Sequence, residues 1–239
     1  MSDSDWDRAI WATWYDLPDD GADEYLAWLH DVHLPAMLRR PGYLWAAHVQ
    51  NIMSPDRERQ SNTTKTSDPS VPTGNAFLLL FGAATVSTFV DPMPAELHAS
   101  LTARERERLD RRVGARSCIF LEVARVDGPD VGKRSPGLTP GPIIQCGSFN
   151  VNSPANEPEV AAWYARDRLP LTTTIANCVG ARELVSVAGW AKHGVLYEFS
   201  SMDGLQPHFH DPHDWRLRVV PNLIHAPHSP SLGRRIWPA

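Results

Sequence analysis

The sequence predicts an α+β protein in which two β-α-β-β-α-β modules follow one another in one chain. Two observations support this prediction. Residues 27–35 (AWLHDVHLP) are echoed by residues 162–170 (AWYARDRLP). Each copy also follows an aromatic, β-rich run and precedes a glycine that opens another strand-like run, so the order of elements recurs as well. A unit of this order folds as a four-stranded antiparallel sheet with both helices on one face, the ferredoxin-like arrangement.

The first module opens with a strand and an amphipathic helix. Residues 10–17 have strand composition and end at a Pro-Asp-Asp-Gly turn signal. In residues 22–39, apolar side chains and His33 recur at three- and four-residue spacing, which predicts a helix with one buried face. Pro35 lies inside this segment and should kink the helix or end its regular part near His33.

The remainder of the first module is predicted from composition and pattern. Residues 43–52 read as a strand, and the polar, proline-rich residues 53–74 as a long hairpin loop. Residues 75–83 contain an unbroken apolar run, typical of a strand buried on both faces. Residues 95–113 are predicted to form a second helix, and residues 117–126 a fourth strand.

The second module is predicted to follow a linker. Residues 128–141 have the composition of a linker, which divides the chain into modules 8–127 and 142–239. The elements predicted in the second module are strands at 143–151, 180–188, 195–199 and 233–237, and helices at 158–176 and 203–224. Each module would leave one apolar sheet face bare. We therefore expect the two sheets to pack face to face as an intramolecular α+β barrel.

Composition excludes several classes of function. The 239-residue chain has a net charge of −5, which gives no basic face for nucleic acid. It contains no apolar run near the roughly 20 residues that cross a bilayer and no secretory signal, so we expect a cytoplasmic protein. The three cysteines are isolated and read as reduced core residues. Nucleotide-binding glycine loops, Gly-x-Ser-x-Gly and HExxH motifs are lacking, which argues against kinases, dehydrogenases, α/β-hydrolases and zincins.

The helix signature resembles that of a known family. The chain is similar to the EthD-like branch of the dimeric α+β barrel superfamily in the order of its first elements. These are a strand, a helix that ends Trp-x4-His-Leu-Pro (Trp28, His33 and Pro35), a Pro-Gly pair and another strand. This chain would be a tandem fusion. The resemblance implies that His33 lies in a pocket between helix and sheet, where relatives similar to muconolactone-type isomerases and polyketide dehydratases or cyclases move protons on small cyclic substrates.

His33 is the principal candidate for catalysis. On an apolar helix face, desolvation should lower its pKa and leave a neutral imidazole able to act as a base. A tyrosine, Tyr15 or Tyr43, would donate a proton to a developing enolate oxygen. Further residues could bind the substrate in this first-module pocket: His30, Trp14, Trp45 and His48. A histidine that merely packs in the core is the structural alternative.

Two other groups of residues have binding chemistry. Arg168 replaces His33 in the second module, so a pocket there, with Arg182, would favour a carboxylate, although a plain ion pair fits the same residues. His208, His210 and His213 have the composition of a metal site, but their spacing fits no known motif. The resemblance implies haem as an alternative, because some members of the superfamily bind haem through a histidine on the corresponding second helix. We therefore predict neither a metal nor a cofactor.

The sequence thus predicts a cofactor-independent lyase or isomerase that acts on a small, cyclic or aromatic molecule. Two alternatives remain open: a haem- or metal-dependent oxidoreductase, and a non-catalytic protein that binds a small ligand. Nucleic acid and membrane are not expected as partners, and a homodimer is left open.

Overall fold

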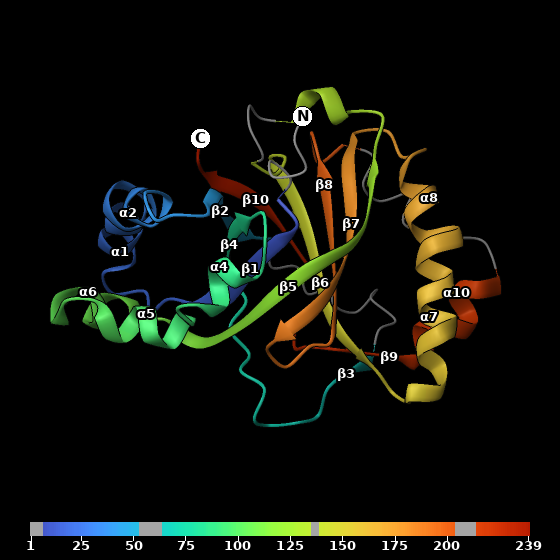
Figure 1. The fold of residues 1–239 in the computed structure, drawn as a ribbon, viewed down its shortest axis with the longest axis horizontal. Helices are drawn as coiled ribbons and strands as arrows, with labels where there is room; N and C mark the ends of the chain where they lie inside the picture. The colour runs from blue at the N-terminus through green and yellow to red at the C-terminus, as the bar shows by residue number, and fades with distance from the viewer. Residues whose placement is uncertain (1–6, 53–63, 135–138, 204–213) are drawn as a thin grey trace.

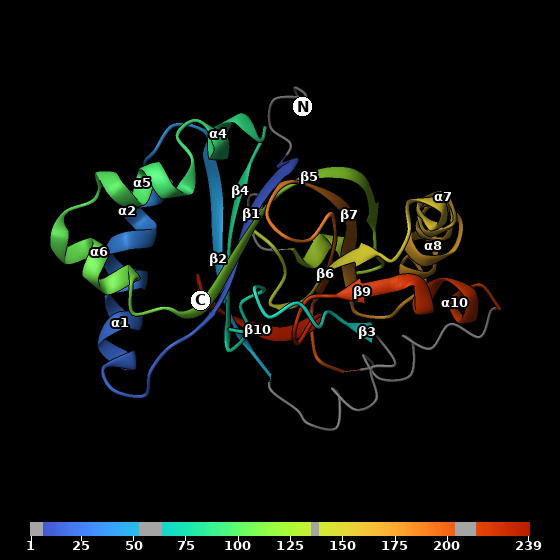
Figure 2. The same ribbon diagram turned by 90° about the horizontal axis from the view of Figure 1, so that it is seen from below.

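The computed structural model describes residues 7–52, 64–134, 139–203 and 214–239. Its centre is one closed antiparallel β-barrel, flanked by helices on two opposite sides (Figures 1 and 2). Eight strands form the ring in the order β10-β2-β4-β1-β5-β7-β8-β6, and β6 pairs with β10 to close it. Their bounds are β1 Ala9–Asp16, β2 Tyr43–Asn51, β4 Phe77–Ala83, β5 Val113–Asp127, β6 Ile143–Val151, β7 Cys178–Ala188, β8 His193–Phe199 and β10 Ser231–Trp237.

The predicted fold class, two sheets packed face to face, is wrong. The strands of the two halves are joined edge to edge, because β5 hydrogen bonds to β7 and β10 hydrogen bonds to β2. A single ring leaves no free sheet edge, and its inner face is buried by the curvature of the barrel itself. The protein is therefore mostly sheet in a closed barrel, with short helices outside it. The division into modules at 128–141 stays a prediction.

The first helical layer covers β1, β2 and β4. It contains α1 (Ala22–Trp28), η2 (Leu29–His33), α2 (Leu34–Leu38), α4 (Ser87–Val90), α5 (Pro94–Ser100) and α6 (Ala103–Leu109). The single helix predicted over 95–113 is wrong, because Leu101 is extended and Thr102 begins a new helix. The Glu105 N–H donates to the Thr102 hydroxyl at 3.3 Å, and the Thr102 N–H donates to the Glu105 carboxylate at 3.0 Å. This capping box starts α6.

The second helical layer lies on the opposite side of the barrel. It contains η4 (Pro154–Asn156), α7 (Glu157–Trp163), η5 (Tyr164–Arg168), α8 (Leu169–Thr172), α10 (Asp214–Val219) and η6 (Val220–Asn222). The helix predicted over 203–224 is shorter where it is described, since α10 ends at Val219 and β9 (Leu223–His225) follows. β9 pairs with β6 and with β3 (Thr64–Lys65), which lies in the predicted 53–74 loop. The short helix η3 (Val131–Lys133) lies in the predicted linker.

Successive side chains of a strand point to opposite faces of the barrel wall, and the buried side chains form three separate cores. In β4, Leu78 and Leu80 point into the barrel, whereas Phe77, Leu79 and Phe81 point toward the first helical layer. All seven residues of β4 are therefore buried, as expected for a strand covered on both faces. A separate core joins α7 and α8 to the other side of the ring. Among the described residues, no helix is long and apolar enough to cross a membrane.

Candidate functional site between the first helical layer and the barrel

Two π-helical turns each end on a buried basic side chain. The Leu34 N–H donates to the Leu29 carbonyl, five residues back, at the end of η2. A proline follows in α2; it lacks an N–H and crowds the carbonyl four residues earlier, which favours the wider turn. Another proline, Pro170, lies at the equivalent position after η5. His33 and Arg168 are the last residues of these turns and are only 8% and 9% exposed.

Three side chains of the first layer form a hydrogen-bonded chain. The hydroxyl of Tyr15 on β1 and Nε2 of His48 on β2 are 2.8 Å apart. Nδ1 of His48 is in turn 2.8 Å from Nε2 of His30 on η2. Tyr15 and His48 are fully buried, whereas His30 is partly exposed, so the chain runs from the core toward the surface. This arrangement can orient the His30 ring and leaves its Nδ1 at the outer end.

Burial sets the protonation of this chain. Desolvation, and then the nearby His30 and Arg112, hold the pKa of His48 well below its ordinary value. Desolvation also lowers the pKa of His30, against the opposing charge of Asp31. Burial raises the pKa of the Tyr15 hydroxyl well above its ordinary value. At neutral pH the chain therefore consists of a phenol and two neutral imidazoles, which can accept a proton at the outer end.

His33 points away from this chain. Its ring packs on Trp28, with the ring centroids 5.1 Å apart. Desolvation first, and then the charge of Arg112, lower the pKa of His33 to about 4, against the opposing charge of Glu105. The prediction that His33 is buried on the helix face and neutral agrees with this geometry. Its expected partnership with His30 does not, because the π-helical turn directs the two rings to different neighbours.

Two residues of the layer were missed in the sequence. Arg112 lies with its guanidinium 4.5 Å from the centre of the Tyr15 ring, and its Nε donates to the Tyr25 hydroxyl at 2.7 Å. It lies in the segment 95–113, for which the sequence predicts only a helix. Trp237 of β10 stacks on His30 with the ring centroids 6.4 Å apart. It reaches the site because β10 pairs with β2, which no local pattern reveals.

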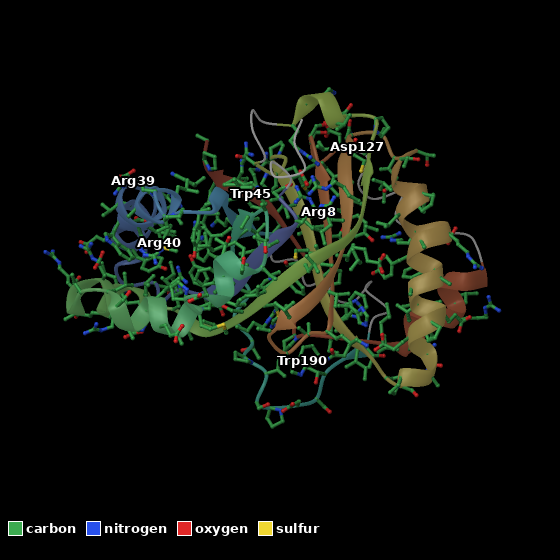
Figure 3. The ribbon with its side chains drawn as sticks, in the orientation of Figure 1. Arg8, Arg39, Arg40, Trp45, Asp127 and Trp190 are labelled. Carbon is green, nitrogen blue, oxygen red and sulfur yellow. The ribbon has the colours of Figure 1, made fainter. Side chains whose placement is uncertain are left out.

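Three predicted site residues lie elsewhere. Tyr43 is at the opposite end of the layer against Phe81 and Phe89, and burial raises its pKa to about 12. Trp14 and Trp45 point into the barrel, because they are out of phase with the residues that face the helices. Trp45, labelled in Figure 3, donates from Nε1 to Asp7 at 2.7 Å.

The two arginines predicted to bind substrate are not together. Arg168 donates from Nε to the Tyr197 hydroxyl at 2.9 Å, and its guanidinium lies 6.0 Å from the centre of the Trp163 ring. Arg182 lies inside the barrel in an ion pair with Asp7 at 2.7 Å. The expected pocket of two arginines is therefore not formed.

The residues described include no cluster of three or more metal-binding side chains. His208, His210 and His213 lie outside the described part of the chain. That the protein uses neither a metal nor a cofactor stays a prediction.

No known family model matches the chain, and no curated protein matches its sequence. Its fold is similar to that of an anthrone oxidase-like protein, with a TM-score of 0.60 and 9% identity over 98% of this chain and 93% of the other. It is also similar to a putative monooxygenase from Fusobacterium nucleatum, with a TM-score of 0.57 and 8% identity over 97% and 94% of the two chains. For a putative chlorite dismutase the TM-score is 0.54, with 13% identity over 95% and 94%. These proteins belong to the dimeric α+β barrel superfamily. At such identities the likeness is one of fold, and membership of the EthD-like branch stays a prediction.

Proposed function

We propose that the protein is an enzyme of small-molecule metabolism whose reaction begins with proton abstraction by His30. The hydrogen-bonded chain from Tyr15 through His48 to His30 is the observation that carries this proposal. In one tautomeric state His48 donates from Nε2 to Tyr15, and His30 donates from Nε2 to His48. The lone pair of Nδ1 of His30 is then free to take a proton from the substrate.

The substrate that suits this base is a cyclic or aromatic molecule with an acidic C–H beside a carbonyl. The C–H proton passes to Nδ1 of His30, and its bonding electrons form an enolate. The Trp237 ring beside His30 offers an aromatic surface on which a planar substrate can stack. Tyr15 acts as a positioning residue, because its bond to His48 fixes which imidazole nitrogen carries the proton.

Two reaction classes share this first step. A lyase or isomerase would expel a leaving group from the enolate or return the proton to another atom, and this remains our first choice. An oxygenase would instead transfer electrons from the enolate to O2. The names of two structural neighbours, an anthrone oxidase-like protein and a monooxygenase, favour this second candidate.

Exchange of substrate protons with solvent tests the first step directly. Cyclic ketones, lactones and anthrone would be incubated with the full chain in D2O, under nitrogen and in air, and deuterium uptake followed by NMR. We expect His30→Ala to slow exchange by about 100-fold or more, and His193→Ala, at a partly buried histidine of β8 that bonds to Glu157, to leave it unchanged. Product formation only in air would identify an oxygenase.

His33→Ala is measured in the same assay, because His33 remains the base predicted from sequence, with Tyr15 or Tyr43 as its partner. Loss of exchange in His33→Ala but not in His30→Ala would restore that assignment. Equal rates in all variants would end the proton-transfer proposal. A Soret band or stoichiometric metal in the active protein would instead support the oxidoreductase alternative.

A further inference from the structure

Two arginines are buried inside the barrel, near its opposite ends. At one end Arg182 forms ion pairs with Asp7 at 2.7 Å and Glu198 at 3.1 Å, and Glu122 lies 3.8 Å away. Burial opposes ionisation of Asp7, but the guanidiniums of Arg182 and Arg125 hold its pKa below the usual value. The charges at this end of the barrel are therefore matched within the protein. Trp45, which is labelled in Figure 3, lies at this end and donates to Asp7.

Arg116 is placed very differently. It is 8% exposed, and its guanidinium lies 4.2 Å from the centre of the Trp14 ring. Nη1 donates to the Ser148 hydroxyl at 3.2 Å and Nη2 to the Pro227 carbonyl at 3.4 Å. Its Nε is buried and, within the described residues, meets no hydrogen-bond acceptor. No carboxylate of those residues forms an ion pair with it.

The neighbours of Arg116 cannot supply the missing negative charge. Burial raises the pKa of Cys146 to about 12 and raises that of Cys118, so both thiols are protonated at neutral pH. Burial lowers the pKa of Arg116 to about 10, and its guanidinium is still charged at neutral pH. A buried charge without a counter-charge is strongly unfavourable. The same barrel thus neutralises one interior arginine completely and leaves the other unmatched.

We infer that the Arg116 end of the barrel is a binding site for a small monocarboxylate. One positive charge is unmatched, so a monoanion neutralises it, whereas a dianion would leave a buried negative charge. The free Nε–H and the adjacent Nη–H of a guanidinium lie side by side, the geometry that a planar carboxylate accepts with both oxygens. The Ser148 hydroxyl is a further polar group beside the guanidinium.

This inference is independent of the proposed function. Arg116, Trp14 and Ser148 face the barrel interior, whereas Tyr15, His48 and His30 belong to the interface with the first helical layer. Neighbouring residues of β1 and β5 point to opposite faces of the ring, so the wall of the barrel separates the two sites.

Thermal unfolding of the full chain with added acetate or benzoate tests the site. In buffer free of carboxylate and phosphate, we expect either anion to raise the Tm of the wild type saturably, by about 2–5 °C. Arg39→Met, at an exposed arginine of the first layer, should respond in the same way. Arg116→Met should not respond.

Three results would overturn the inference. These are no shift in the wild type, an equal shift in Arg116→Met, and an equal shift with chloride or phosphate. Ser148→Ala retains the arginine and serves if Arg116→Met does not fold. It should weaken the Kd for acetate about 5- to 10-fold, and an unchanged Kd would count against the site.

Discussion

In the first helical layer η2 carries His30, which faces His48 on the barrel, and His33, which packs on Trp28. In the second layer η5 carries Arg168 at the position that corresponds to His33. His30 bonds to a histidine that is itself bonded to a tyrosine, whereas Arg168 donates to the hydroxyl of Tyr197 directly. One backbone geometry therefore supports a neutral, proton-accepting chain on one side and a permanent charge on the other. The basic residues of the turns and the sheet residues that face them both differ between the layers.

Exchanging the two basic residues should have the largest effect. His33→Arg places a second buried guanidinium near Arg112, and the carboxylate of Glu105 offsets this repulsion only in part, so we expect a loss of about 3–5 kcal/mol in unfolding free energy. Arg168→His removes the hydrogen bond to Tyr197 and should cost about 2 kcal/mol. Urea unfolding measures both. If both losses were below about 0.5 kcal/mol, the layers would be interchangeable and the comparison would fail.

The two layers should also respond differently to acid. The pKa of His33 is about 4 in the folded protein and about 6.5 in an unfolded chain. As pH falls below about 6.5 the unfolded chain binds the proton first, so stability is lost between about pH 6.5 and 4, by up to about 3 kcal/mol. His33→Gln should flatten this part of the pH profile. Arg168→Gln should not, since arginine does not titrate there. Parallel profiles for wild type and His33→Gln would contradict the assignment.

Removing the tyrosine hydroxyls should have a smaller effect, and an unequal one. Tyr197→Phe removes the acceptor of a charged guanidinium and should cost about 2 kcal/mol. Tyr15→Phe removes a neutral hydrogen bond but keeps the stacking on His48, so we expect a cost of about 1 kcal/mol. Equal losses, measured by urea unfolding at pH 7, would show that the charge of Arg168 adds nothing to its bond.

The smallest expected change concerns Trp237. Trp237→Ala exposes His30, so desolvation weakens and the pKa of His30 should move up toward its ordinary value, with little change in stability. NMR titration of the histidine ring protons measures this shift. His193 of β8, which bonds to Glu157 of the second layer, serves as the internal reference. A pKa of His30 that stays the same or falls would mean that Trp237 does not shield the site.

Patterns within short stretches of the sequence predicted much of the local secondary structure and burial. The apolar run 75–83 identified a strand buried on both faces, and the spacing around His33 identified a buried helix face. The break at Thr102 was also readable, since Thr-x-x-Glu is a capping box, but the charge pattern around it was taken for one helix. The packing of the two sheets was wrong because apolar alternation shows that a face is buried without showing what covers it. A barrel interior and a second sheet produce the same pattern.

The candidate site was predicted only in part for the same reason. His30, His48 and Tyr15 were among the residues chosen, yet their hydrogen bonds depend on strand register and on the wider turn of η2. Trp14 and Trp45 are predicted from sequence to bind substrate beside these residues, yet both point into the barrel, because a shift of one residue along a strand reverses the direction of a side chain. Arg112 and Trp237 reach the site through tertiary contacts alone.

Closure of the ring by β10 has a consequence for the chain during synthesis. The edge of β2 is made early, but its partner β10 follows it only after a long stretch of sequence. Until that segment has emerged from the ribosome, the hydrogen-bonding groups along this edge of β2 are open to strands of other chains. Pairing over so great a separation along the chain is also slow. Mispairing along β2 is therefore a hazard that lasts until β10 has docked.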